Sequence, residues 1–202
     1  MDFSMLSIPS NIFNGFGFFP NFKWNKFSKV SYVFSFGIYS FLFSNFKEEK
    51  IIFINTTLYF YDNFYGILKE TFDKFTFSLR KYKYKFLKYF YNLCFGKQIN
   101  IENYKFLIQK KDFNKYEIYL NNKLNFVKNI STKKKFLLNL FKKRIKDKKL
   151  VFFISKEDKI LPFKSQINFL KLLKDQSIFY ETYEILDNHF PKFFENILKG
   201  IT

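Results

Sequence analysis

An uncharged run near the start of the chain has a serine and a glycine after apolar residues: Val30-Ser31-Tyr32-Val33-Phe34-Ser35-Phe36-Gly37. Val30–Phe34 is short and rich in β-branched and aromatic residues, which predicts a buried strand. Residues 36–46 carry no formal charge and predict a helix. Ser35 therefore stands at the turn between a strand and a helix.

A second apolar run, Ile51–Asn55, follows this helix and predicts a neighbouring strand. Strand, helix and strand in this order form a βαβ unit, whose two strands lie parallel in one sheet. The same alternation returns later in the chain, where we expect a strand at 150–154, a helix at 164–174, a strand at 178–185 and a closing helix at 190–198. The sequence thus predicts an α/β fold.

Residues 62–148 separate the two parts of the predicted sheet and differ from them in composition. They are rich in lysine and mainly helix-like. Apolar residues at three- and four-residue spacing predict one amphipathic helix, formed around Leu79, Tyr82, Phe86, Tyr89, Phe90 and Leu93. We expect a single domain over 1–202, with its core in 1–61 and 149–202 and a helical insertion at approximately 62–148.

Three side chains that can carry out nucleophilic catalysis stand beside these predicted elements. Ser35 ends the first strand, Asp158 follows the strand at 150–154, and His189, the single histidine, precedes the closing helix. Their order along the chain, Ser, Asp and His, is that of the α/β-hydrolases.

The chemistry of such a triad assigns a role to each residue. The Ser35 hydroxyl attacks an ester carbonyl, His189 takes and returns its proton, and Asp158 orients the imidazole. A serine that only caps the helix, or a histidine that is only packed, is the alternative. Glu157 and Asp187 are second choices for the acid. We therefore expect a reduced α/β-hydrolase sheet, with the insertion as a helical lid between the nucleophile half and the Asp/His half.

Composition limits the class of protein. The chain is 48% hydrophobic and 24% aromatic, which argues against disorder, and its formal net charge is +18. Such a charge suits a protein that binds an acidic protein, nucleic acid or an anionic membrane, although AT-rich codons also favour lysine and phenylalanine.

Cys94 is the single cysteine, so we expect no disulfide framework, no metal site and no cofactor. Prolines and glycines interrupt the uncharged residues 3–22, and residues 30–46 are short, so we expect a cytoplasmic protein without membrane spans.

Several motifs together resemble a known family, the BioG-type esterases of biotin synthesis. Phe34-Ser35-Phe36-Gly37-Ile38 is similar to the family's W-S-x-G elbow, with Phe34 in place of tryptophan and Val33 where a smaller residue is usual. Ile54–Tyr59 followed by Asp62–Ile67 resembles its N-G-T and G-I segments. Further similar segments are Thr71-Phe72, Phe90-Tyr91, Cys94–Gly96, Ser155–Pro162 with Gln166, and His189–Pro191 with Phe193-Phe194. The resemblance covers roughly residues 30–98 and 150–195.

The resemblance implies a substrate and further site residues. Family members cleave the methyl ester of pimeloyl-acyl carrier protein, an acidic partner. The backbone N–H groups of Phe36 and Phe16 would form the oxyanion hole, the latter within Asn14–Gly17; alternatively, Met1–Ser4 matches a later strand and this loop is absent. Lysines of the lid would dock the carrier, and its aromatic residues would line an acyl channel. The docking candidates are Arg80, Lys81, Lys85 and Lys88, with Lys142, Lys143 and Arg144 as a second group.

Three other functions compete with this one. A related hydrolase could act on another ester or thioester, because a triad does not fix specificity. A hydrolase fold could also be non-catalytic. A basic nucleic-acid- or ribosome-associated protein would explain the charge and the interleaved aromatic residues, but not the order of Ser35, Asp158 and His189. We therefore expect no nucleic-acid partner; the sequence leaves the oligomeric state open.

Overall fold

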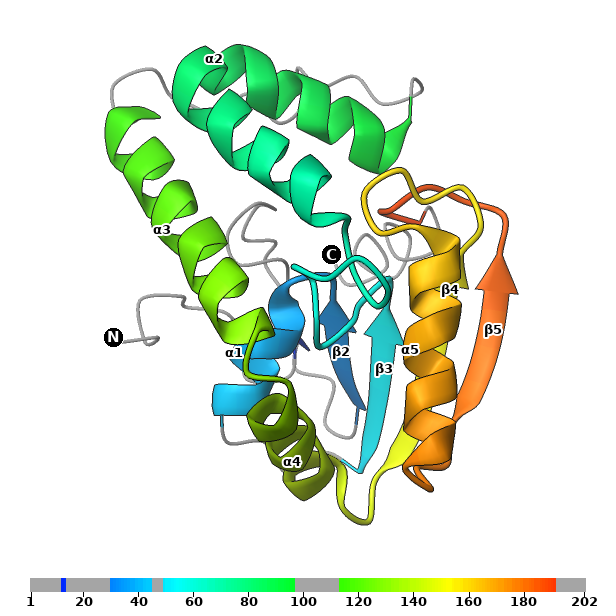
Figure 1. Cartoon of the computed structure of the whole chain (residues 1–202). Helices are drawn as coiled ribbons and strands as arrows, with labels where there is room; N and C mark the ends of the chain where they lie inside the picture. Colours follow the sequence, from blue (N-terminus) through cyan, green and yellow to red (C-terminus); the bar gives the residue numbers. More distant parts are fainter. Residues whose placement is uncertain (1–11, 14–29, 45–48, 97–112, 192–202) are drawn as a thin grey trace.

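The computed structural model describes residues 12–13, 30–44, 49–96 and 113–191 and has an α/β fold (Figure 1). Within these ranges it contains five strands and five helices. In chain order they are β1 (Ile12–Phe13), β2 (Val30–Phe34), α1 (Gly37–Phe43), β3 (Lys50–Ile54), α2 (Lys69–Phe95), α3 (Phe113–Ser131), α4 (Lys134–Ile145), β4 (Lys149–Ser155), α5 (Phe163–Asp175) and β5 (Glu181–Ile185).

The strands form one sheet in the order β1-β2-β3-β4-β5, and every neighbouring pair is parallel. The predicted parallel sheet is confirmed, and the strand expected at 178–185 is shorter, beginning at Glu181. Strand β1 was not predicted, because two residues are too short to give a pattern. Phe34 pairs with Ile54 and Ile54 with Phe153, so β2, β3 and β4 end at the same edge. The residues that follow these strands therefore lie close together.

Aromatic side chains form the core between the sheet and three of its helices. Phe53 of β3 and Phe152 of β4 stack with their ring centroids 4.6 Å apart. Phe41 of α1 and Phe141 of α4 each lie 5.6 Å from Phe53, and Phe169 of α5 lies 6.3 Å from Phe152. Helices α1, α4 and α5 therefore cover the same face of the sheet. Burying each of these rings contributes about 1.5–3 kcal/mol.

The insertion between β3 and β4 divides into two parts. Helix α4 packs on the sheet through Phe141, whereas Figure 1 shows α2 beyond the carboxyl ends of the strands. Helix α3 packs along α2 and reaches α1, where Phe126 contacts Tyr39 with a centroid distance of 6.1 Å. Only α2 and α3 are thus arranged as a lid would be, and their role as a lid stays a prediction.

Helix boundaries differ from the sequence prediction at three places. Helix α1 ends at Phe43 rather than at 46, because Ser44 has an extended backbone. Helix α2 is longer than expected and bends at Lys83, whose φ of 45° and ψ of −114° are not helical. In the predicted helix at 190–198, Phe190 and Pro191 are not helical, and the remainder lies outside the described residues. None of the helices in the described ranges has the length and hydropathy that a membrane span needs.

Candidate active site

Ser35 occupies a tight turn between β2 and α1. Its φ of 50° lies in the left-handed region, which a residue with a side chain adopts only at a cost of about 1–2 kcal/mol. The Ser35 N–H donates to the Ile54 carbonyl at 3.0 Å, and the Ser35 carbonyl accepts from Thr56 Oγ1 at 2.7 Å. Hydrogen bonds from the end of β3 therefore hold this strained turn in place. The predicted strand–serine–helix turn is confirmed.

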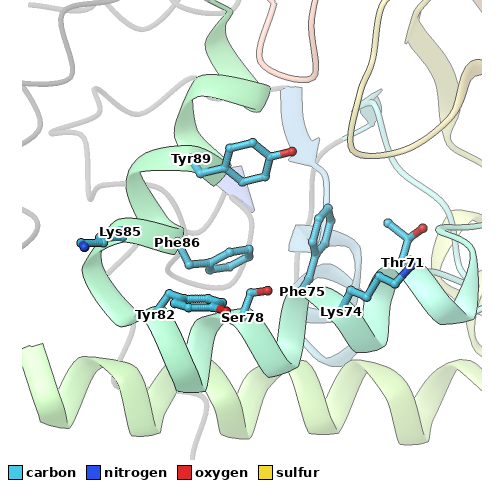
Figure 2. Close-up of a pocket in the computed structure, with 8 residues that line it drawn as sticks. All are labelled: Thr71, Lys74, Phe75, Ser78, Tyr82, Lys85, Phe86 and Tyr89. Atoms are coloured by element: carbon cyan, nitrogen blue, oxygen red, sulfur yellow. The ribbon is translucent and has the colours of Figure 1, made fainter.

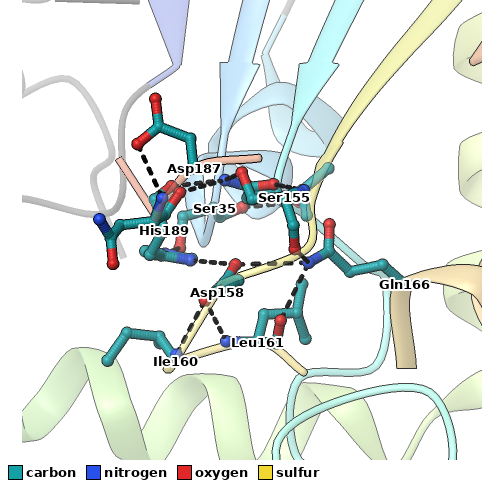
Figure 3. A network of polar contacts seen from close by, with 11 residues as sticks. Ser35, Ser155, Asp158, Ile160, Leu161, Gln166, Asp187 and His189 are labelled. Atoms are coloured by element: carbon teal, nitrogen blue, oxygen red, sulfur yellow. Dashed lines mark hydrogen bonds and ion pairs between the residues drawn. The ribbon is translucent and has the colours of Figure 1, made fainter. Parts of the chain in front are cut away.

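Ser35, His189 and Asp158 form a continuous hydrogen-bonded row (Figure 3). Nε2 of His189 lies 2.8 Å from Oγ of Ser35, and Nδ1 of His189 lies 2.7 Å from Oδ2 of Asp158. An ionised carboxylate only accepts hydrogen bonds, so Nδ1 carries the imidazole proton and Nε2 can accept the serine O–H. This is the tautomer that a general base needs. The structure brings these three residues together, from positions far apart in the sequence.

The Asp158 carboxylate is held by the loop that contains it. Its Oδ1 accepts the backbone N–H groups of Ile160 and Leu161, each at 2.8 Å, and Oδ2 accepts from Gln166 Nε2 at 3.4 Å. Together with His189 these donors give both oxygens partners, as a buried charge requires. Of the second-choice acids, Glu157 is exposed and the Asp187 carboxylate accepts the Asn188 N–H at 2.8 Å.

The three residues of this hydrogen-bonded row are buried, with exposed fractions of 1% for Ser35, 7% for Asp158 and 0% for His189. The carboxyl end of α2 covers the segment around His189, where the Phe190 N–H donates to the Cys94 carbonyl at 2.8 Å. Gly96 ends α2 with a φ of 75°, and a Cβ there would lie 2.8 Å from Asn188 Nδ2. The carboxyl end of α2 thus lies directly against the segment that carries His189.

Cys94 lies close to Asp158 and His189, but its thiol is not a reactive nucleophile. Burial raises the pKa of the Cys94 thiol well above its usual value, and the negative charge of Asp158 raises the pKa further. The reactive form of a cysteine is the thiolate. Cys94 is therefore a neutral thiol at physiological pH and contributes packing to the core.

Asn55 is a residue of this site to which the sequence assigned no role. It directly follows β3, and its side chain bonds to Ser155 at the end of β4 and to the backbone carbonyl of His189. The sequence showed only its position, because Asn55 ends the predicted strand at 51–55, which runs beside the strand that ends before Ser35. The pattern of the sequence gave no indication of its partners.

Of the two candidate oxyanion donors, Phe36 and Phe16, the structure describes only Phe36. Phe36 directly follows Ser35, and its ring is buried against Phe60, with a centroid distance of 4.4 Å. Phe16 lies outside the described residues. Strand β1 pairs parallel with β2 and ends at Phe13, so the chain leaves β1 at the edge where Ser35 stands.

The first group of docking candidates lies on α2 and is exposed: Arg80, Lys81, Lys85 and Lys88. Arg80 Nε donates to Asn121 Oδ1 of α3 at 3.3 Å. The Lys81 ammonium lies 5.5 Å from the centroid of the Phe77 ring and 5.3 Å from that of Tyr82. This face of α2 thus combines positive charge with exposed aromatic rings.

The second group lies in the last turn of α4, and two of its members bond within the protein. Lys142 Nζ donates to Gln176 Oε1 at 2.7 Å, and Arg144 Nε donates to the Leu42 carbonyl at 2.9 Å. These bonds tie α4 to the residues that follow α5 and to α1. Lys143 is exposed, whereas Lys142 and Arg144 are partly buried.

A cavity of about 380 Å³ lies inside the bend of α2 (Figure 2). Figure 2 shows that both halves of the bent helix contribute aromatic rings to it, and a lysine stands on each half. The lining residues are Thr71, Lys74, Phe75, Ser78, Tyr82, Lys85, Phe86 and Tyr89. Tyr82 and Tyr89, which the periodicity placed on a buried helix face, are about half exposed because they border this cavity.

Comparison with solved structures finds proteins that are similar to this chain, and two of them are described here. No protein-family model matches the chain, and no curated protein matches it. It is similar to BioG from Haemophilus influenzae, with 16% identity and a TM-score of 0.46 over 79% of this chain and 66% of that one. It is also similar to an esterase from Exiguobacterium antarcticum, with 14% identity and a TM-score of 0.47 over 85% of this chain and 64% of that one. The chain thus spans slightly less than two thirds of the length of each.

Proposed function

We propose that this chain is a serine carboxylesterase in which Ser35 is the nucleophile, His189 the general base and acid, and Asp158 the residue that orients the imidazole. The proposal rests on one observation, the row of 2.8 Å and 2.7 Å contacts that joins these three side chains. Residues far apart in the sequence meet there in the order that the chemistry requires.

The reaction proceeds through an acyl-enzyme. Oγ of Ser35 forms a bond to the ester carbonyl carbon while its proton passes to Nε2 of His189. The tetrahedral intermediate then collapses, the bond to the leaving alkoxide breaks, and His189 returns the proton to give the alcohol. A water molecule attacks the acyl-enzyme with the same imidazole as base, which releases the carboxylic acid and restores Ser35. Asp158 stays ionised and stabilises the imidazolium that forms in each half.

The negative oxygen of the tetrahedral intermediate needs hydrogen-bond donors. The backbone N–H of Phe36, next to the nucleophile, is the first donor that we propose. The second is the N–H of Phe16, because residues 14–17 follow β1 in the sequence and β1 ends at the Ser35 edge. Each such donor contributes about 2.7–4 kcal/mol to the stability of the transition state.

The proposed substrate is the methyl ester of pimeloyl-acyl carrier protein. An enzyme that acts on this substrate would work in the cytoplasm. Two features support this choice besides the sequence motifs. The exposed basic residues of α2 complement an acidic carrier protein, and the cavity in the bend of α2 offers aromatic rings for an acyl chain. We further propose that α2 and α3 act as a lid, since the triad is buried beneath the end of α2.

Hydrolysis of a short p-nitrophenyl ester tests the esterase proposal. The wild-type protein should turn the ester over, and Ser35→Ala should lower kcat by roughly 10⁴-fold or more. Ser40→Ala is the matched control, because Ser40 is a buried serine on α1 outside the row of contacts. Equal activities of wild type and Ser35→Ala would refute the proposal.

Binding experiments separate the proposed partner from a nucleic acid. We expect a salt-sensitive complex with acyl-acyl carrier protein and no stoichiometric complex with a structured RNA of similar charge. Hydrolysis of pimeloyl-acyl carrier protein methyl ester, with release of methanol, would distinguish this substrate from other esters. A protein that binds RNA tightly and hydrolyses neither ester would favour the basic, non-enzymatic alternative.

A further inference from the structure

Three consecutive residues at the end of β3 contact the backbones that carry the triad. The carbonyl of Ile54 accepts the Ser35 N–H at 3.0 Å, and Oγ1 of Thr56 donates to the Ser35 carbonyl at 2.7 Å. Ile54, which ends β3, and Thr56, two residues later, therefore hold the Ser35 turn through its N–H and its carbonyl. The residue between these two, Asn55, makes the remaining connections.

The Asn55 side chain uses its donors and its acceptor on the other two triad segments. Nδ2 lies 2.6 Å from the carbonyl of His189 and 2.7 Å from Oγ of Ser155, with the Asn188 carbonyl at 3.3 Å. Oδ1 accepts the Ser155 N–H at 2.8 Å. Ser155 begins the loop that contains Asp158, and its carbonyl accepts the Asp158 N–H at 3.5 Å. One amide therefore bonds to the segments of both His189 and Asp158.

The side chains of Asn55 and Thr56 are buried, and neither contacts the reacting atoms. Asn55 is 1% exposed and Thr56 2% exposed. Asn55 also has a φ of 45°, a conformation that asparagine adopts more readily than most residues. A leucine or valine of similar size could fill the space, but it could not pair the carbonyl of His189 and the N–H of Ser155.

We propose that Asn55 and Thr56 are positioning residues of the esterase, and that they set the distance between Ser35 Oγ and His189 Nε2. This inference rests on the proposed function for its kinetic consequence only. In a nucleophilic site a displacement of about 1 Å can lower the rate by roughly 10²-fold. Loss of either residue should therefore lower kcat more than it changes KM.

Three substitutions test this role. Asn55→Gly tolerates the positive φ and removes the amide without adding charge; we expect kcat on a p-nitrophenyl ester to fall by about 30-fold or more and KM to change less than about 3-fold. Thr56→Val keeps the shape and removes the donor, and should lower kcat by about 10-fold. Thr56→Ser keeps the hydroxyl and should restore kcat to within about 2-fold. Asn121→Ala, at a buried asparagine of α3, is the control for stability alone.

The single histidine provides a readout that is independent of turnover. In protein with ¹⁵N-labelled histidine, the Nδ1–H proton that bonds to Asp158 gives one imidazole signal. We expect this signal to shift in Asn55→Gly and Thr56→Val, together with the midpoint of the pH profile of kcat/KM. It should stay in place in Thr56→Ser and Asn121→Ala.

The outcomes separate this inference from the proposed function. Folded Asn55→Gly and Thr56→Val proteins with wild-type kcat and an unmoved imidazole signal would overturn the positioning role. If Asn55→Gly does not fold, the Thr56→Val and Thr56→Ser pair decides in the same way. If the wild type hydrolyses no ester but the signal still moves, the positioning is supported and the proposed reaction is wrong.

Discussion

Among single residues, the proposed reaction depends most on the negative charge of Asp158. Asp158→Asn keeps the shape of the side chain but removes the charge that stabilises the imidazolium and selects its tautomer. We expect kcat/KM on a p-nitrophenyl ester to fall by roughly 10⁴-fold with the fold intact. Steady-state kinetics and circular dichroism check both parts. Glu157→Gln is the matched control, because Glu157 is exposed beside Asp158. If Glu157→Gln loses activity and Asp158→Asn does not, the assignment of the acid to Asp158 is wrong.

The three residues of the hydrogen-bonded row could be singled out from the sequence because each stands beside a local signal. Ser35 follows a clear strand and precedes a helix, Asp158 follows another strand, and His189 is the single histidine. The role of Asn55 could not be predicted in this way, since its partners Ser155 and His189 are 100 and 134 residues further along the chain. Periodicity and spacing describe neighbours in sequence, and they contain no information about such contacts.

At the scale of elements, Asp62 anchors the connection from β3 to α2. Its Oδ1 accepts the N–H groups of Phe64 and Tyr65 at 2.9 Å each, and its Oδ2 lies 2.6 Å from Lys134 Nζ. Burial by itself would raise the pKa of Asp62, but the hydrogen bonds from Lys134, Tyr65 and Phe64 outweigh burial and hold this pKa below its ordinary value. The ionised carboxylate therefore stabilises the folded protein.

Asp62→Asn should lower the free energy of unfolding by about 1.5 kcal/mol at neutral pH. The pKa is lower in the folded than in the unfolded protein, so this stabilisation is fully present above the unfolded pKa of about 3.9 and is lost as the pH falls through the folded pKa. Urea unfolding of both proteins between about pH 7 and about pH 2.5 checks this dependence. Glu70→Gln, in the exposed pair with Lys74, should leave stability nearly unchanged. A difference between Asp62→Asn and wild type that persists at the acid limit would contradict the assignment.

The elements themselves were predicted better than their packing. An apolar stripe shows that a helix buries one face but not which partner covers it, so the sequence did not separate α4, which packs on the sheet, from α2 and α3. The bend at Lys83 could not be predicted, because no proline or glycine stands near it and the apolar spacing continues across it from Leu79 to Phe86. Strand β1 is too short for any pattern.

At the scale of the whole molecule, the net charge of +18 should act through the face of α2. Reversing two exposed charges there, with Lys81→Glu and Lys88→Glu together, should raise KM for an acyl-carrier-protein ester by about tenfold at low salt. KM for a p-nitrophenyl ester should not change. Ionic strength of about 0.5 M should remove most of the difference, because salt screens charges at the surface.

The same charge change on α5, with Lys171→Glu and Lys174→Glu, is the control for net charge alone. Both lysines are exposed, so this variant alters the total charge equally and leaves α2 intact. We expect its KM for the carrier-protein ester to stay within about 2-fold of wild type. If both double variants raise KM equally, overall charge rather than a docking surface on α2 governs the association.

In the proposed reaction the imidazole of His189 activates the hydroxyl of Ser35, and covalent labelling gives a direct test of this activation. A fluorophosphonate reacts with an activated serine, forms a phosphonyl–oxygen bond and releases fluoride. Peptide mapping by mass spectrometry should find one adduct, on Ser35, in the wild-type protein and none in His189→Ala. An adduct on another residue, or equal labelling of Ser35 with and without the imidazole, would contradict the claim.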